Sequence, residues 1–344
     1  MADSSRKTVN LALQGGGSHG AFTWGVLDRL LEEESFVIEG ISGTSAGALN
    51  GAALLQGWCK NGCQGARASL DAFWQDVGNL TSFEMPQAPP LASMFGSWNM
   101  ELAPGAMIAD AWQRMFSPYQ TNPFNVNPLR DLLAKLLDID AIRACGDIKL
   151  FVCATEVETG HARIFAREEL TLDALMASAC LPFAFQAVGI AGKPYWDGGY
   201  VGNPALFPLI YNCGSADVIL VQINPLKRPG TPETPAAIID RLNEITFNAA
   251  LIGEMRAIAF VERLIEEDHL KDAKAAKLKR INMHMIGDEE EMRKLGAASK
   301  LDASMDFLLH LKEVGRAAAD RWIKQNAALI GQRSSIDIRK LFLD

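Results

Sequence analysis

Three short segments of the chain combine residue types that suit acyl transfer. The first, Gly43-Thr44-Ser45-Ala46-Gly47, fits the pattern G-x-S-x-G, whose small residues allow a tight turn that exposes a serine hydroxyl. Such a turn has a strained backbone and lies close to other segments, which glycine tolerates best. Ser45 is therefore the candidate nucleophile, and Gly43 and Gly47 form the elbow. Taken alone, the pentapeptide also fits a turn whose serine only caps a helix.

The second segment is the glycine run Gly15-Gly16-Gly17, which continues through His19 to Gly20. Successive glycines let backbone N–H groups approach a ligand closely, and a following helix adds the positive end of its dipole. Such a loop can hold an anion or the oxyanion of a reacting ester. The spacing also fits G-x-G-x-x-G, the pattern of dinucleotide-binding proteins. A nucleotide-binding module is therefore a second hypothesis, from a different class of function.

The third segment is Asp197-Gly198-Gly199, which follows Tyr195 and Trp196. Aromatic neighbours can shield a carboxylate from water, and desolvation raises its pKa toward that of a useful general base. The glycines let the acid lie close to another loop. Alone, D-G-G is a common turn.

The joint occurrence of the three segments favours an enzyme. An elbow serine, an oxyanion loop and a glycine-flanked acid supply each part that acyl transfer needs. The dinucleotide hypothesis accounts for the glycine run and for Glu39, which lies where such proteins carry a ribose-binding acid, but it leaves Ser45 unexplained.

The elements around these segments alternate between strand and helix, which predicts an α/β fold with a mainly parallel sheet. Apolar β-branched runs predict strands, and apolar residues at three- and four-residue steps predict helices. The predicted strands are Thr8–Leu13, Phe36–Ile41, Lys149–Thr155, Val218–Ile223 and Ile281–Ile286. The predicted helices are Ala21–Glu34, Ala46–Trp58, Pro128–Leu137, Leu172–Ala179, Pro235–Asp268 and Asp302–Lys324.

The composition is that of a soluble globular protein, with 49% hydrophobic and 22% charged residues in 344. A net charge of −8 argues against nucleic acid as the main partner, because phosphate binding needs a basic face. The chain has no uninterrupted apolar run long enough for a membrane span and no signal-peptide core at its start. We therefore expect a cytoplasmic protein that can contact the inner face of the membrane peripherally. The sequence leaves the oligomeric state open.

The six cysteines predict buried free thiols. Cys59 and Cys63 have a spacing that suits a metal or a disulfide, but no second Cys/His pair follows at zinc-site spacing. We therefore predict no metal.

We predict one domain over residues 1–344, since the chain shows no internal repeat. Residues 81–127 hold six prolines and five methionines without a clear period, which indicates an irregular insertion. Its methionines suit adaptable contact with acyl chains, so it is a candidate lid; an ordinary structural insertion is the alternative. The basic run Lys271–Arg280 is interpreted as a solvated helix face, with contact to anionic lipid as the alternative.

In these motifs the chain resembles the patatin-like phospholipase family, whose members carry a glycine-rich loop, G-x-S-x-G and D-G-G/A in this order. Further similarities lie in residues 177–183 (ASACLPF), in Gly202-Asn203-Pro204 and in Gly315-Arg316. The resemblance covers roughly residues 8–225, which it implies are the catalytic core, with a mostly helical part at 226–344 packed on it. The resemblance implies a patatin-like three-layer fold with a mainly parallel central sheet between helices. It also implies cleavage of lipid acyl esters, of the phospholipase A or lysophospholipase type, with no cofactor.

The resemblance further implies a Ser45–Asp197 dyad, with the amides of Gly15, Gly16 and Gly17 as the oxyanion hole. His19 stands where many members carry Arg or Lys, so we expect anion affinity near the loop to fall as His19 loses its proton. Two alternatives concern substrate and mechanism. The substrate can be a simple carboxylic ester or a hydroxyalkanoate oligomer, and a Ser–Asp–His triad can use a histidine that follows Asp197. The candidates are His269, His284 and His310.

Overall fold

The computed structural model describes residues 6–33, 35–81, 117–267, 278–296 and 298–343. Eight strands form one sheet in these residues. They are β1 (Lys7–Leu13), β2 (Phe36–Thr44), β3 (Lys149–Glu156), β4 (Ala162–Ala166), β5 (Val188–Ile190), β6 (Lys193–Asp197), β7 (Asp217–Gln222) and β8 (Asn282–Gly287).

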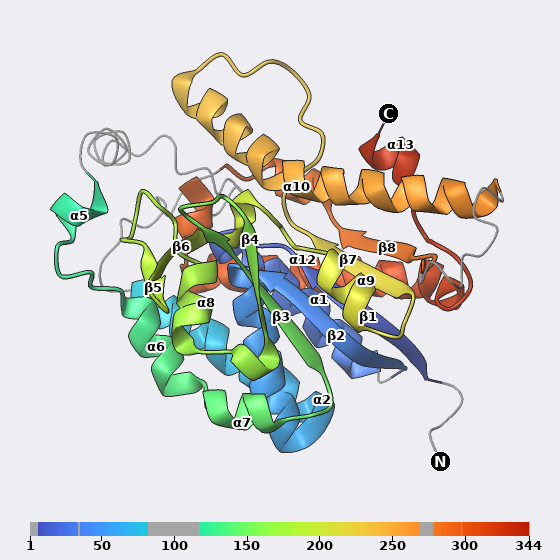
Figure 1. The fold of residues 1–344 in the computed structure, drawn as a ribbon, viewed down its shortest axis with the longest axis horizontal. Helices are drawn as coiled ribbons and strands as arrows, with labels where there is room; N and C mark the ends of the chain where they lie inside the picture. Colours follow the sequence, from blue (N-terminus) through green and yellow to red (C-terminus); the bar gives the residue numbers. More distant parts are fainter. Residues whose placement is uncertain (1–5, 34, 82–116, 268–277, 297, 344) are drawn as a thin grey trace.

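Helices connect and cover these strands (Figure 1). The α-helices are α1 (Gly20–Glu33), α2 (Ala46–Thr81), α5 (Pro118–Thr121), α6 (Pro128–Leu136), α7 (Ile139–Ala144), α8 (Leu172–Ser178), α9 (Phe207–Asn212), α10 (Pro235–Glu266), α11 (Glu289–Arg293), α12 (Met305–Asn326) and α13 (Ile338–Phe342). The short 3₁₀ turns are η1 (Gly17–His19), η3 (Arg167–Glu169), η4 (Gly198–Tyr200), η5 (Ala298–Leu301) and η6 (Ala327–Leu329).

The strand order is β5-β6-β3-β2-β1-β7-β8, and β4 also pairs with β3. Strands β3, β2, β1, β7 and β8 run parallel, whereas β4 and β6 run antiparallel to β3. The parallel strands are buried over most of their length, because helices cover both faces of the sheet. This arrangement confirms the predicted three-layer α/β fold.

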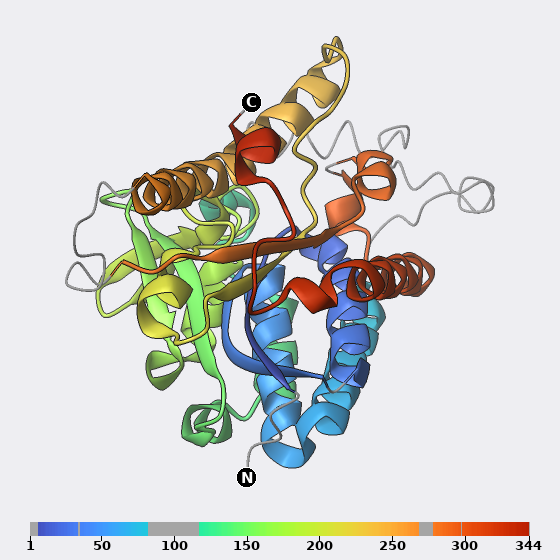
Figure 2. The same cartoon turned by 90° about the vertical axis from the view of Figure 1, so that its right-hand side faces the viewer.

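Two apolar clusters mark the two faces of the sheet. The larger cluster joins the sheet to α1, α2 and α12, and also takes in residues of α6, α7 and α8. The smaller cluster joins the opposite face to α9, α10 and α13. Figure 2 shows α1, α2 and α12 gathered on one side of the sheet, with α10 on the other. Segments from both halves of the sequence therefore share each core.

Helices α1 and α12 pack closely against each other, and each helix carries a glycine where it meets the backbone of the other. A Cβ at Gly25 would overlap the backbone of Lys312, and a Cβ at Gly315 would overlap the backbone of Phe22. Only glycine at both positions allows this approach, so Gly315 of the sequence analysis has a packing role. We call this contact the α1–α12 seam.

All predicted strands and helices are present, with ends that differ by a few residues except in one case. The helix predicted to end at Trp58 continues to Thr81 after a kink at Asn61 and Gly62. The antiparallel strands β4, β5 and β6 and several helices of four to six residues were not predicted. Such elements are too short to show a clear period.

The prediction of free thiols is wrong for two of the six cysteines. Cys59 and Cys145 form a disulfide across 86 residues, where α7 packs against α2. Spacing along the chain pointed to Cys63 and could not reveal a partner that tertiary packing supplies. Cys153, Cys180 and Cys213 are buried free thiols, as predicted.

No helix in the described ranges is both long and apolar enough to cross a membrane. Most of the candidate lid (residues 82–116) and most of the basic run (271–277) lie outside the described residues. The predicted domain boundaries stay predictions.

Candidate active site

The sheet brings the three motif segments together at one end of its parallel strands. The glycine run follows β1, and Ser45 follows the neighbouring parallel strand β2. Asp197 is the last residue of β6, and β3 lies between β6 and β2. Thr44 pairs with Cys153 of β3, and Asp197 pairs with the next residue of that strand, Ala154. The nucleophile and acid candidates therefore lie across one strand from each other.

Ser45 occupies the strained turn that its motif predicts. Its φ is +53°, in the left-handed region that non-glycine residues rarely adopt, and its side chain is buried. A Cβ at Gly43 would come within 2.6 Å of the Gly47 backbone, so the two elbow glycines are in direct contact. Backbone strain at a turn between a strand and a helix is typical of a functional serine.

A second serine, Ser178 at the end of α8, holds this turn in place. The Ser45 N–H donates to Ser178 Oγ at 2.9 Å, and the Ser178 hydroxyl donates to the Cys153 carbonyl at 2.6 Å. Ser178 is fully buried, and it connects the elbow to β3. It lies in the segment 177–183 that the sequence analysis singled out without assigning it a role.

We predict that Ser178→Ala lowers both stability and activity. The change leaves a buried N–H and a buried carbonyl unpaired, which costs about 1–3 kcal/mol of unfolding free energy. Displacement of the elbow should lower kcat roughly tenfold. Urea unfolding and ester hydrolysis measure the two effects.

Thr171→Ala is the matched control, because Thr171 caps the other end of α8 by accepting the Ala174 N–H at 2.9 Å. It should cost about 1 kcal/mol and leave kcat unchanged. Equal kcat values for the two variants would show that Ser178 does not position Ser45.

Asp197 is buried at the site, with 1% of its surface exposed. Its Oδ1 accepts the Gly199 N–H at 2.7 Å. Within the described part of the chain, Oδ2 has no partner with full hydrogen-bond geometry. The Ser45 hydroxyl nevertheless lies near enough to stabilise the carboxylate. Oδ2 is thus an acceptor still open to a proton from Ser45.

Burial raises the pKa of Asp197 from 3.8 to about 6. The Gly199 N–H, the Ser45 hydroxyl and the charge of Lys300 each oppose this rise. A carboxylate with a pKa near 6 is ionised at neutral pH and is a stronger base than an ordinary aspartate.

The glycine run lies against the elbow, but its first amide is already engaged. A Cβ at Gly15 would come within 2.6 Å of the Thr44 carbonyl, so the loop and the elbow touch. The Gly15 N–H donates to Asn203 Oδ1 at 2.6 Å. Gly15 therefore does not offer the oxyanion amide that the resemblance implies, because Asn203 uses it. Gly16 and Gly17 stay the predicted donors.

The expectation that His19 titrates is wrong. His19 is buried, and burial together with the nearby charge of Lys300 holds its pKa well below the ordinary value. Ser299 donates its hydroxyl to the Gly296 carbonyl at 2.7 Å, so at 2.7 Å it must accept a hydrogen bond from His19 Nε2. His19 is thus a neutral side chain with its proton on Nε2, and it carries no charge for an anion.

The histidines that follow Asp197 are the candidates for a triad. His284 lies on β8 with its Nε2 3.0 Å from Asp217 Oδ1, and His310 is exposed on α12. His269 lies outside the described residues. Glu39, the acid of the nucleotide hypothesis, accepts the N–H groups of Gly214 and Ser215 at 2.6 and 2.7 Å.

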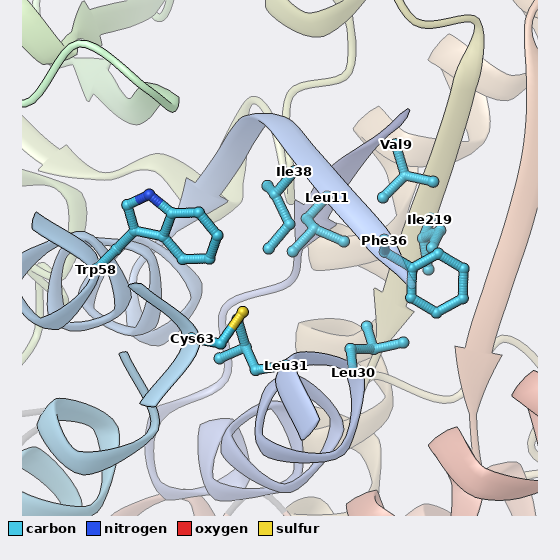
Figure 3. A pocket seen from close by; sticks show the side chains of 9 residues that line it. All are labelled: Val9, Leu11, Leu30, Leu31, Phe36, Ile38, Trp58, Cys63 and Ile219. Carbon is cyan, nitrogen blue, oxygen red and sulfur yellow. The ribbon is translucent and has the colours of Figure 1, made fainter. Parts of the chain in front are cut away.

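A small apolar cavity lies between the sheet and helices α1 and α2 (Figure 3). Its volume of about 10 Å³ has room for about one water molecule, so it does not bind a substrate. Its walls are formed by Val9, Leu11, Leu30, Leu31, Phe36, Ile38, Trp58, Cys63 and Ile219. Among the residues that the structure describes, no group of three or more His, Cys, Asp or Glu could hold a metal.

A buried network of amide side chains supports the loop, and sequence reasoning missed it. Gln14 Oε1 accepts the N–H groups of Ile223 and Asn224, both at 2.9 Å. Its Nε2 donates to the Asn203 carbonyl at 3.2 Å. A signal was present, since Gln14 interrupts an apolar run and Asn203 lies in the Gly202-Asn203-Pro204 segment. Asn224 stands alone in the sequence and gave no signal.

Fold and site together define an α/β protein with a serine on a strained strand–helix turn beside a buried acid. The chain belongs to the patatin-like phospholipase family, because the model of that family matches residues 11–210. Membership identifies it as a lipid acyl hydrolase by class. A sequence comparison with curated proteins gave no match.

Among solved structures, the chain is similar to VipD from Legionella pneumophila, with 15% identity and a TM-score of 0.35 over 89% of this chain and 67% of VipD. It is also similar to full-length ExoU of Pseudomonas aeruginosa in complex with SpcU, with 15% identity and a TM-score of 0.29. This match covers 80% of this chain and 61% of ExoU. A second ExoU–SpcU structure has 16% identity and a TM-score of 0.31, and the match covers 99% of this chain and 75% of that protein. The chain thus spans about two thirds of the length of these proteins.

Proposed function

We propose that this chain cleaves acyl esters of membrane lipids, of the phospholipase A or lysophospholipase type, through a Ser45–Asp197 dyad. The observation that carries the proposal is the meeting of a strained, buried serine with a carboxylate whose pKa is raised to about 6. A serine hydroxyl is a weak nucleophile unless a base receives its proton, and Asp197 Oδ2 is the acceptor that the site offers.

In the acylation step, Ser45 Oγ attacks the ester carbonyl carbon and Asp197 takes the hydroxyl proton. The amides of Gly16 and Gly17 hold the oxyanion, each contributing about 3 kcal/mol to the lowering of the barrier. Collapse of this intermediate breaks the bond to the leaving alcohol, which receives the proton from Asp197. Water then attacks the acyl-enzyme while Asp197 takes its proton. The bond between the acyl carbon and Ser45 Oγ breaks, Asp197 returns the proton to Ser45, and the fatty acid is released.

Exposed apolar side chains beside the site suit a lipid surface. Phe183 is 72% exposed and follows Cys180, whose carbonyl accepts the Asp197 N–H at 2.8 Å. Phe124 and Val126 are also exposed. Their segment is held near Phe183 by two hydrogen bonds: the Gln186 side chain donates to the Asn122 carbonyl, and the Ala187 N–H donates to the Tyr119 hydroxyl. Large apolar residues gathered on a surface commonly mark contact with a membrane or a partner.

We predict that the protein releases fatty acid from phosphatidylcholine vesicles and that Phe183→Ser lowers this rate about tenfold. One buried aromatic ring contributes roughly 1.5–3 kcal/mol to contact with an apolar phase. Hydrolysis of the soluble ester p-nitrophenyl butyrate should be unchanged. Tyr211→Ser is the matched control, because Tyr211 is an aromatic residue of α9 with 80% exposure.

The same assay tests the alternative substrates. Hydrolysis of p-nitrophenyl butyrate or hydroxybutyrate oligomers without fatty acid release from vesicles would replace the phospholipid proposal by a carboxylesterase or oligomer hydrolase. A thermal shift with NAD(P) and no ester hydrolysis would favour the nucleotide-binding module.

A cytoplasmic location with peripheral contact at the inner membrane face stays a prediction. The Cys59–Cys145 disulfide stands against the cytoplasmic part, since disulfides persist mainly in oxidising compartments.

A further inference from the structure

Lys300 lies beside the active site although it follows the region matched by the family model, residues 11–210. Its turn η5 packs against η1, which contains the last glycine of the run. A Cβ at Gly17 would overlap the Lys300 carbonyl, and Gly17 has a φ of +59°. The backbone of Lys300 is therefore in contact with the oxyanion loop.

The side chain of Lys300 lies between the glycine run and the D-G-G turn. Its Nζ donates to Asn224 Oδ1 at 3.0 Å and lies 5.3 Å from the centre of the Phe247 ring. Phe247 packs so closely on Gly199 that a Cβ there would overlap the ring. The ammonium group is thus partly buried next to both parts of the site.

Asn224 connects this ammonium to the oxyanion loop. Its Nδ2 donates to the Gly15 carbonyl at 2.9 Å. In a trans peptide, the carbonyl of one residue and the N–H of the next point in opposite directions. The bond to Gly15 therefore directs the Gly16 N–H away from Asn224. The Lys300 ammonium polarises the side-chain amide of Asn224, which then polarises the Gly15–Gly16 peptide and strengthens the Gly16 N–H as a donor.

Lys300 also acts on the acid. Its charge lowers the pKa of Asp197, against the larger rise that burial causes. Burial lowers the pKa of Lys300, and the charge of Arg228 after β7 adds to this, whereas Glu244 and Asp240 of α10 and Asp197 of β6 favour its charged form. His19 of η1 in turn senses the charge of Lys300. The other titratable groups that sense Asp197 are Cys153, Cys180 and Tyr200.

We propose that Lys300 is the positioning cation of this active site, which strengthens the oxyanion loop through Asn224 and keeps Asp197 ionised. Neutral His19, although next to the loop, cannot supply this charge. The inference rests on the proposed hydrolase function and deepens it. It assigns a role in the reaction to a residue of the C-terminal part of the chain.

The test compares Lys300→Met and Lys300→Gln with wild type in p-nitrophenyl butyrate hydrolysis from pH 5 to 9. We expect kcat to fall about 10- to 100-fold with KM within about threefold, because the loss acts on the transition state. The acid limb of kcat/KM should move up by about one pH unit, since loss of a nearby cation raises the pKa of Asp197. Lys300→Arg should restore the wild-type limb.

Lys294→Met is the matched control, because Lys294 is an exposed lysine next to α11 that pairs with Glu291. It should behave as wild type. Thermal unfolding identifies which of the two neutral Lys300 variants is folded, and either one suffices.

A folded neutral variant with a wild-type acid limb and a kcat within twofold of wild type would overturn the role of Lys300. Labelling of the same preparations with a fluorophosphonate probe keeps this outcome separate from failure of the hydrolase proposal. If only the role of Lys300 fails, the probe still labels Ser45 of the wild type; if the hydrolase proposal fails, it does not.

Discussion

Ser45→Ala should abolish ester hydrolysis, lowering kcat at least about ten-thousandfold, and should remove all labelling by a fluorophosphonate probe. The probe reacts with an activated serine, and loss of the nucleophile from a catalytic unit costs most of its rate. The fold should survive, since alanine keeps the Cβ and the Ser45 N–H to Ser178 is a backbone bond. Labelling followed by mass spectrometry of the modified peptide measures the effect.

Ser42→Ala is the control for this experiment. Ser42 lies on β2, the strand that precedes Ser45, is buried, and donates its hydroxyl to the Ala205 carbonyl at 2.5 Å. This variant should keep its labelling even if its stability falls. Persistent labelling of Ser45→Ala would show that another residue is the nucleophile.

Asp197→Asn should lower kcat about a thousandfold or more, because an amide cannot accept the Ser45 proton. In the wild type, kcat/KM should fall about tenfold per pH unit below about 6, as Asp197 gains a proton. A wild-type profile that is flat from pH 5 to 8, or an Asn variant with wild-type kcat, would exclude Asp197 as the base. Variants of His269, His284 and His310 to Ala should each keep their activity, which tests the triad directly.

Asp197→Asn should also make the protein more stable at neutral and alkaline pH. Folding raises the pKa of Asp197 from 3.8 to about 6, so its favourable contribution is present below the unfolded pKa and lost as pH rises through about 6. At pH 8 the folded protein holds a buried carboxylate. Removing that charge should raise the free energy of unfolding by about 1–3 kcal/mol. Urea unfolding at pH 8 and pH 4 checks this, since the gain should shrink toward pH 4.

Local pattern was sufficient for the long elements of the fold. The parallel strands are continuous apolar runs, and the long helices repeat apolar residues at helical spacing, so both show a period. The strand β6 has no such pattern, and its place beside β3 depends on pairing with residues about 40 positions earlier in the chain. The disulfide Cys59–Cys145 was missed for the same reason, because its partners meet only in the folded chain.

The motifs named the residues of the candidate site but not their hydrogen bonds. The glycine pattern could not show that Asn203 occupies the Gly15 amide, since an asparagine 188 residues away supplies the acceptor. Nor could it show that His19 is neutral, because its environment is formed by residues near the C-terminus. Lys300 carries no motif, and only the packing of η5 on η1 brings it to the loop.

The α1–α12 seam has a consequence for how the protein unfolds. Helix α1 begins directly after η1, the turn that contains the last glycine of the run, and Gly25 and Gly315 allow backbone contact between α1 and α12. Neither helix can leave this contact without exposing the buried apolar side chains that the two share in the larger core. The start of the chain and its last long helix therefore belong to one cooperative unit. Heat or denaturant that releases α12 should also release the support of the oxyanion loop, so catalytic activity and helical structure should disappear in the same transition.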